Sequence, residues 1–219
     1  MTDDARAALV RRGLWLNYAT LSYNIAEAVV SLVAGVLAGS VALVGFGFDS
    51  VIEVVASGAA QWRLRADLAG ERRERVERLS HRVVGWCFLA LGAYVAFESV
   101  ASLWTRSRPE RTLIGIVVLA ASAIVMPLLA RAKRHIARAL DSRSLGSEAA
   151  QTSLCAYLSV IALAGVALNA LFGWWWADPL AALAMVPIIG YEGLEGIRPK
   201  HAADSCCCAG RPGNRATFR

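Results

Sequence analysis

Two acidic residues, Asp49 and Glu53, lie four positions apart inside a long apolar segment. Residues 45–55 read GFGFDSVIEVV. A spacing of four places both carboxyl groups on one face of a helix, one turn apart. A charge is costly inside a membrane helix, and two neighbouring ionised carboxylates also repel each other. Such a pair either shares a proton or holds a cation, so the pattern predicts a site that exchanges a divalent cation for protons.

A second apolar segment carries donors at the same spacing. Gln151 and Cys155 are four apart and share a helix face. Alone they are weak evidence, because Cys often fills apolar space and Gln can bond a neighbouring helix. Opposite two carboxylates, they complete a four-residue set that suits a four-coordinate metal ion such as zinc. We therefore predict a metal site made of Asp49, Glu53, Gln151 and Cys155.

Three further polar residues flank this set. Asn24 and Glu27 share a face of the first apolar segment, and either line the pathway, brace the acids, or pack helices together. Glu148 lies on the side of Gln151 and is a ligand, a proton carrier or a packing residue. We assign no Lys or Arg to any predicted span, so no basic residue is expected to neutralise the acids. Asp178, which precedes a proline, is predicted to cap the last span.

The composition indicates the elements that must position these residues. The chain has 219 residues, of which 57% are apolar and 18% charged. Soluble domains contain fewer apolar residues and about 25% charged ones, so an ordinary soluble enzyme and a disordered chain are disfavoured. A membrane helix needs about 20 apolar residues. Six segments qualify, which predicts an all-α integral membrane protein with spans at Trp15–Ala38, Val41–Trp62, Val83–Trp104, Thr112–Ala130, Glu148–Phe172 and Trp175–Leu194.

The basic residues predict the orientation of these spans. All but three of the 23 Lys and Arg lie before the first span, in the second and fourth connections, or after the last span; the exceptions are Arg106, Arg108 and Arg111. The positive-inside rule then places both termini in the cytoplasm of a multi-pass protein of the cell membrane. The net charge is +6, but the basic residues lie between the apolar segments. This pattern is typical of a membrane protein, so we expect no nucleic-acid partner.

Three regions follow from this topology. We expect a cytoplasmic N-terminal segment at 1–14, a six-helix transporter domain at 15–197, and a Cys-containing, disordered cytoplasmic tail at 198–219. The tail carries His201 and three consecutive cysteines at 206–208. Metal loading, palmitoylation and simple disorder all remain open for it. The polar connection 63–82 is expected to extend the second and third helices beyond the membrane.

At these residues the chain resembles the cation diffusion facilitator family, over about 15–200. The resemblance lies in Asn24 and Glu27, in the segments GSVAL at 39–43 and DSVIE at 49–53, and in EAAQT at 148–152 with Cys155. It also lies in GWWWADPLAAL at 173–183. An aromatic run followed by Asp-Pro is a frequent signature of that family.

The resemblance implies six helices, a homodimer, and export of a divalent metal, usually zinc, in exchange for protons. It implies that two residues of span two and two of span five form the transport site, here Asp49, Glu53, Gln151 and Cys155. The family pattern usually has Asp or His paired with Asp on each helix. Gln and Cys depart from it, and a thiolate favours softer ions, so cadmium or another transition metal is an alternative to zinc. We expect the branch that lacks the family's C-terminal cytoplasmic domain.

The sequence therefore predicts a proton-coupled exporter of a divalent transition metal, which is its cargo and not a cofactor. The alternative is a membrane-embedded protein that binds metal without moving it. An intramembrane hydrolase would need a His pair, such as His-Glu-x-x-His, or two aspartates on different spans. No such His pair occurs, and Asp178, the aspartate on another predicted span, is predicted to cap that span, so no enzymatic activity is expected.

Overall fold

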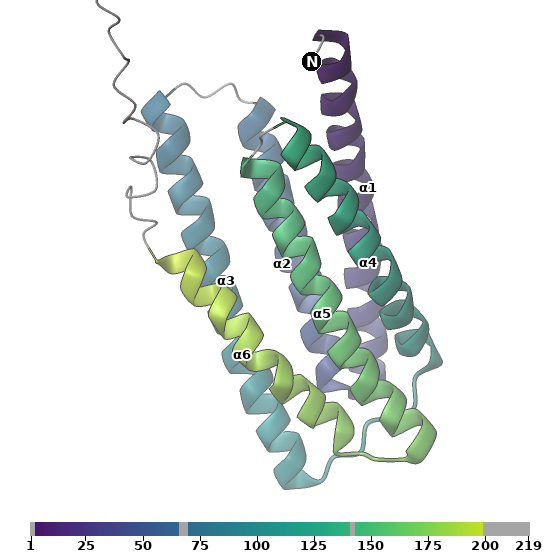
Figure 1. Cartoon of the computed structure of the whole chain (residues 1–219). Coiled ribbons are helices and arrows are strands. Elements are labelled where there is room, and N and C mark those ends of the chain that lie inside the picture. Colours follow the sequence, from purple (N-terminus) through teal and green to yellow (C-terminus); the bar gives the residue numbers. More distant parts are fainter. Residues whose placement is uncertain (1–2, 66–69, 141–142, 199–219) are drawn as a thin grey trace, which may run out of the picture.

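The computed structural model describes residues 3–65, 70–140 and 143–198, and within those ranges all regular structure is α-helical. Figure 1 shows six long helices arranged as a bundle. In chain order they are α1 (Asp3–Ala38), α2 (Val41–Arg65), α3 (Gly70–Thr105), α4 (Leu113–Leu140), α5 (Arg143–Phe172) and α6 (Ala177–Ile197). The predicted all-α class is confirmed. The tail beyond Arg198 and residues 66–69, which connect α2 to α3, lie outside the described residues.

Each helix contains a stretch long and apolar enough to cross a membrane. These stretches are 11–38, 41–58, 82–105, 113–140, 148–172 and 177–197. The six spans predicted from the sequence are thus confirmed. We call the end of the bundle where α1 begins and α6 finishes the terminal end. The opposite end, with the α1–α2, α3–α4 and α5–α6 connections, is the turn end (Figure 1).

The helix boundaries differ from the prediction mainly at the terminal end. At the turn end, the helices begin or finish within two residues of the predicted spans. At the terminal end they continue further, as α2 does to Arg65 and α4 to Leu140. The extension of α2 and α3 into the polar connection was expected; that of α4 was not. Hydropathy marks where a helix leaves hydrocarbon, whereas the hydrogen-bonded backbone continues through the polar turns beyond.

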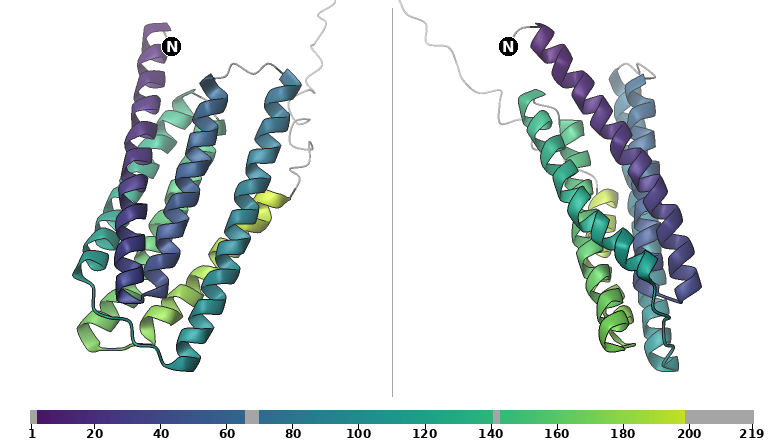
Figure 2. Two further views of the ribbon diagram at one scale, coloured as in Figure 1. Left: turned by 180° about the vertical axis from the view of Figure 1, so that it is seen from behind. Right: turned by 90° about the vertical axis from the view of Figure 1, so that its right-hand side faces the viewer.

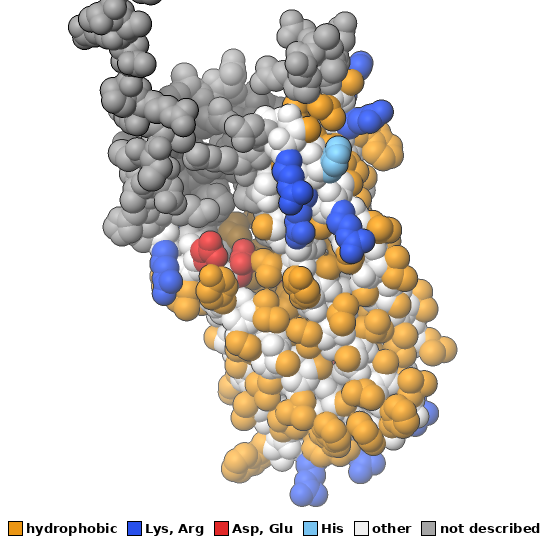
Figure 3. Space-filling view, in the orientation of Figure 1, with side chains coloured by type: hydrophobic (Ala, Val, Ile, Leu, Met, Phe, Trp, Pro, Cys, Tyr) orange, Lys and Arg blue, Asp and Glu red, His pale blue; other side chains and the backbone are white. Residues whose placement is uncertain are grey.

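Side-by-side pairs of helices form the bundle. Helix α3 packs along α6, α4 along α5, and α1 along α2, as the left view of Figure 2 also shows for α3 and α6. Helix α2 additionally contacts α3, α5 and α6. Because α2 touches four other helices, its polar residues can be buried inside protein while other faces of the bundle meet lipid. In Figure 3, apolar side chains cover the lower part of one face, and basic side chains lie towards both ends.

Small residues allow the helix pairs to approach closely. A Cβ atom on Gly85 of α3 would lie 2.8 Å from the carbonyl oxygen of Gly193 on α6. A Cβ on Gly193 would lie 2.9 Å from Leu89 and 3.0 Å from the carbonyl oxygen of Gly85. Backbone cannot yield at such distances as a flexible side chain can. These two glycines therefore fix the depth of α6 against α3, as small residues do at many membrane helix interfaces.

The turn end joins the start of α2 to the start of α6. The Ser40 hydroxyl accepts the Leu43 amide at 3.2 Å and donates to Oδ1 of Asp178 at 2.5 Å. Oδ2 of Asp178 accepts the Val41 amide at 2.9 Å. The prediction that Asp178 caps α6 was wrong: α6 has no side-chain cap, and the carboxylate lies in its first turn but caps α2. Both carboxylate oxygens of Asp178 thus accept hydrogen bonds from donors at the start of α2, which have no partner within that helix.

Candidate metal site

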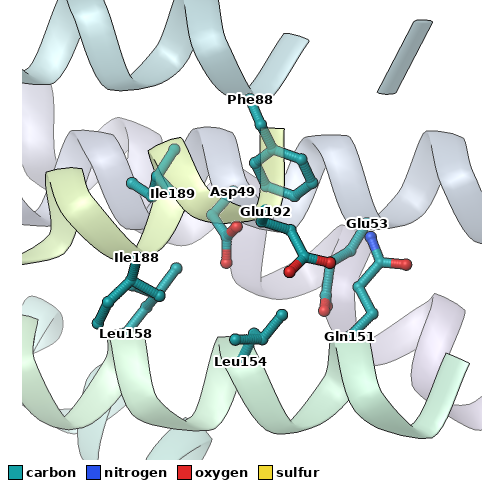
Figure 4. A pocket seen from close by; sticks show the side chains of 9 residues that line it. All are labelled: Asp49, Glu53, Phe88, Gln151, Leu154, Leu158, Ile188, Ile189 and Glu192. Carbon is teal, nitrogen blue, oxygen red and sulfur yellow. The ribbon is translucent and has the colours of Figure 1, made fainter. Parts of the chain in front are cut away.

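The acidic pair lines a small cavity between α2, α3, α5 and α6. Figure 4 shows this cavity from close by. Four of its side chains are polar and five apolar: Asp49, Glu53, Gln151 and Glu192 against Phe88, Leu154, Leu158, Ile188 and Ile189. It has room for roughly one water-sized sphere, which is the size of a largely dehydrated cation. The cavity thus combines oxygen donors with apolar walls.

Asp49 is the most conspicuous group in this cavity. Its side chain is 3% exposed, and its Oδ2 atom has no hydrogen-bond partner. Buried polar atoms are almost always hydrogen-bonded, so an unpartnered carboxylate oxygen in a cavity calls for a specific explanation. A cation or a proton at this oxygen would supply the missing partner.

Glu53 is held by a residue of the first helix. Asn24 donates from Nδ2 to Oε2 of Glu53 at 2.6 Å, and both side chains are buried. This hydrogen bond joins α1 to α2, so it fits both bracing of the acids and helix packing, two of the roles left open for Asn24. Because Asn24 fixes one carboxylate oxygen, the orientation of Glu53 is set from the α1 side while the group still lines the cavity.

Glu27 and Cys155 meet on the other side of the acidic pair. Oε2 of Glu27 accepts the Ser50 hydroxyl at 3.0 Å and contacts Sγ of Cys155 at 3.9 Å. Cys155 is 1% exposed and also interacts with Asp49. It does not line the cavity, whereas Gln151, one turn earlier on α5, does. Three of the four predicted residues, Asp49, Glu53 and Gln151, therefore line one cavity, whereas Cys155 contacts Asp49 without lining it.

A buried lysine corrects the prediction that no basic residue lies within a span. Helix α4 continues through Lys133, which is 1% exposed. Its Nζ lies 3.8 Å from Oε2 of Glu148 and donates to Thr152 Oγ1 at 3.4 Å. Lys133 also interacts electrostatically with Glu53. The buried stripe of α4, with Met126, continues through this position, so helical periodicity carried a signal that hydropathy missed.

Glu192 is the second functional candidate that the sequence analysis did not single out. It lies on α6 and lines the cavity together with both acids of α2. The signal was present, because Glu192 falls inside the predicted sixth span. Its position near the end of that span made it resemble an interfacial residue. Only the packing of α6 against α2 and α3 shows which way it faces.

The donors do not form a closed coordination shell in this structure. Across residues 3–65, 70–140 and 143–198, no three Asp, Glu, His or Cys side chains converge closely enough to hold one metal ion. The cavity instead presents separated donors. Rotation of side chains or a small shift of helices would be needed to bring three of them onto one ion.

Comparison with known proteins bears on the class of this site. Residues 18–200 match the family described as the cation efflux transmembrane domain. This chain belongs to the cation efflux family. Proteins of this family carry metal cations across membranes, which agrees with a helical bundle enclosing buried carboxylates.

Individual cation efflux relatives are distant. The magnetosome protein MamB of Magnetospirillum gryphiswaldense is 26% identical over 169 residues, 74% of this chain and 57% of that protein. MamB of Paramagnetospirillum magneticum is 27% identical over 169 residues, which again cover 74% of this chain and 57% of that protein. Transmembrane protein 163 of Xenopus laevis is 25% identical over 135 residues, 62% of this chain and 48% of the relative. The chain thus matches about half the length of these relatives.

Proposed function

We propose that this protein exports a divalent transition metal, with zinc as the first candidate, from the cytosol across the cell membrane in exchange for protons. The observation that carries the proposal is the buried pair Asp49 and Glu53, with an unpartnered oxygen on Asp49, in a cavity of a cation efflux protein. Metal entry would displace protons from the carboxyl groups, and returning protons would release the metal.

The donor set proposed for the metal is the one predicted from the sequence. Asp49 and Glu53 supply anionic oxygens, and Gln151 supplies an amide oxygen from the facing helix. Cys155 is the fourth proposed donor, reaching the ion from the Asp49 side. Asn24 orients Glu53, while Glu27 contacts both Cys155 and the α2 residue Ser50. Glu27 is thereby placed to take part in proton movement.

Orientation and assembly complete the proposal. The strong excess of Lys and Arg at the terminal end supports cytoplasmic termini, so that metal would enter from that end. Glu53 is one turn closer to the terminal end of α2 than Asp49. Lys133 and Gln151 lie near the terminal ends of α4 and α5. A homodimer is proposed from the family resemblance, with the contact formed by helices of the membrane domain.

Zinc flux into proteoliposomes tests this function. The purified full chain is reconstituted with a zinc-sensitive dye inside the vesicles, and a pH difference is imposed. We expect pH-driven zinc uptake for the wild type and uptake at the level of empty vesicles for Asp49→Asn and Glu53→Gln. Glu195→Gln, which removes an exposed acid of α6, is the matched control and should transport like the wild type.

Two outcomes would contradict the proposal. If both acidic-pair variants transport like the wild type, the site is wrong. If the protein binds zinc in detergent but moves none at any pH difference, it is the membrane-embedded binder considered as the alternative.

A further inference from the structure

We propose that Glu192 of α6 is a third carboxylate ligand of the transported cation, so that the site is built from α2, α5 and α6. The inference rests on the proposed function, because it concerns the same cavity. It extends the donor set beyond the two helices that the sequence pattern and the family resemblance indicate.

The first support is the position of Glu192 in the cavity. Glu192 lines it with Asp49, Glu53 and Gln151, and it interacts electrostatically with Asp49. In the view of Figure 4 its carboxylate is drawn between the side chains of Asp49 and Glu53, which line the same cavity. Asp49 lines this cavity, and its buried Oδ2 has no hydrogen-bond partner, which is an independent sign that a cation or proton is missing here.

The second support is the packing of α6. Met185, Ile189 and Gly193 form the buried stripe of this helix, and Glu192 is three residues after Ile189 on the same side. The close approach of Gly193 to Gly85 fixes this turn of α6 against α3. Phe88, one turn from Gly85, forms an apolar wall of the cavity. The contact between Gly193 and Gly85 thus fixes the turn of α6 that carries Glu192 beside the cavity.

The third support is the chemistry of the donor set. Gln151 is neutral and a weak ligand, and Cys155 lies outside the cavity lining. With only Asp49 and Glu53, the cavity would offer two anionic donors. Glu192 provides a third without requiring the buried thiol to lose its proton. Three carboxylates and an amide oxygen favour hard to borderline divalent ions over the softest ones.

Metal binding by the purified full chain in detergent tests this role, with Co²⁺ as the probe. We expect Glu192→Gln to weaken Co²⁺ binding by at least about tenfold, since loss of even an outer partner of a metal ligand costs that much. Glu195→Gln, the same change one turn further on the exposed face of α6, should bind like the wild type. Binding of Glu192→Gln within twofold of the wild type would overturn the proposal.

A second variant separates ligation from a general electrostatic effect. In a background where all five native cysteines are replaced by serine, Glu192→Cys should add a sulfur-to-cobalt charge-transfer band that is absent from that background and from Glu195→Cys made in it. If Glu192→Gln weakens binding but Glu192→Cys gives no new band, Glu192 is not a ligand.

Asp49→Asn in the same assay distinguishes the two proposals. If Asp49→Asn abolishes binding while Glu192→Gln does not, the role of Glu192 fails and the proposed function stands. If Asp49→Asn also binds and transports like the wild type, the cavity is not the transport site and both fail.

Discussion

Two regions of the bundle bury carboxylates and balance them differently. Between α4 and α5, Glu148 is paired with Lys133, a cation that belongs to the chain. Between α2, α5 and α6, acids on two helices face one cavity, and the residues that line this cavity include no Lys or Arg. A buried carboxylate needs a positive partner or a proton. The first region is balanced by the fold itself, whereas the second depends on what enters from outside.

Glu53 connects the two regions. It lines the cavity, and it also interacts with Lys133. Lys133 therefore contributes positive electrostatic potential at Glu53, although it does not itself line the cavity. Because the lysine acts from outside, several carboxylates can line the cavity while the space between them remains available to a transported ion.

The largest expected effect is the loss of stability when Lys133 is replaced. Lys133→Met removes the cation that lies beside Glu148, whose side chain is only 11% exposed, and breaking a buried ion pair costs about 3–5 kcal/mol. We expect a clear fall in the unfolding temperature of the detergent-solubilised protein, with zinc-dependent stabilisation retained. Arg138→Met, at an exposed position of the same helix, is the control.

A double variant sharpens this test. Lys133→Met combined with Glu148→Gln should recover much of the lost stability, because no unpaired charge then remains in the pair. If Lys133→Met is as stable as the wild type, the lysine does not balance this region and the contrast between the two regions fails.

The next effect concerns the acidic cavity. Zinc at a hundredfold excess over its dissociation constant should stabilise the wild type by about 2.7 kcal/mol. The double variant Asp49→Asn/Glu53→Gln should show no such stabilisation. Without metal it should be at least as stable as the wild type, because two buried acids become neutral amides. Thermal unfolding with and without zinc measures both; a retained zinc shift would place the binding site elsewhere.

A third carboxylate, at the turn end, provides a smaller effect. Asp178 has neither a lysine nor a cavity, since its oxygens accept from Ser40 and the amide of Val41. Ser40→Ala removes the α2 cap and one of these donors, at a cost of about 0.5–2 kcal/mol. Ser159→Ala, whose buried hydroxyl donates within its own helix, should cost less in the same unfolding assay. Equal losses would show that the cap is not special.

The smallest effect is expected at Cys155. Because the thiol contacts Glu27 and Asp49 without lining the cavity, and a hydroxyl can take its place, Cys155→Ser should keep measurable zinc transport. It should lower any preference for cadmium over zinc, since a hydroxyl is a harder ligand than a thiol. Competition fluxes with both ions measure the ratio, and an unchanged ratio would remove Cys155 from the proposed donor set.

The sequence by itself determined the six membrane helices and the acidic pair on α2. Hydropathy and length suffice for the spans, because no membrane helix can leave its backbone unsatisfied in lipid. The spacing of Asp49 and Glu53 suffices for their shared face, because it depends only on helical periodicity. The family resemblance, and not the spacing, implied that Gln151 lies near them, and it does line the cavity.

The tertiary structure alone decided which buried charges meet. Lys133 and Glu192 were missed because hydropathy treats a charge near the end of a span as leaving the membrane, while helix packing buried one and turned the other towards a cavity. Asp178 was assigned to the wrong helix because local sequence cannot show that the start of α2 lies beside it. Charges act through space, so their partners follow from the contacts between helices and not from their positions along the chain.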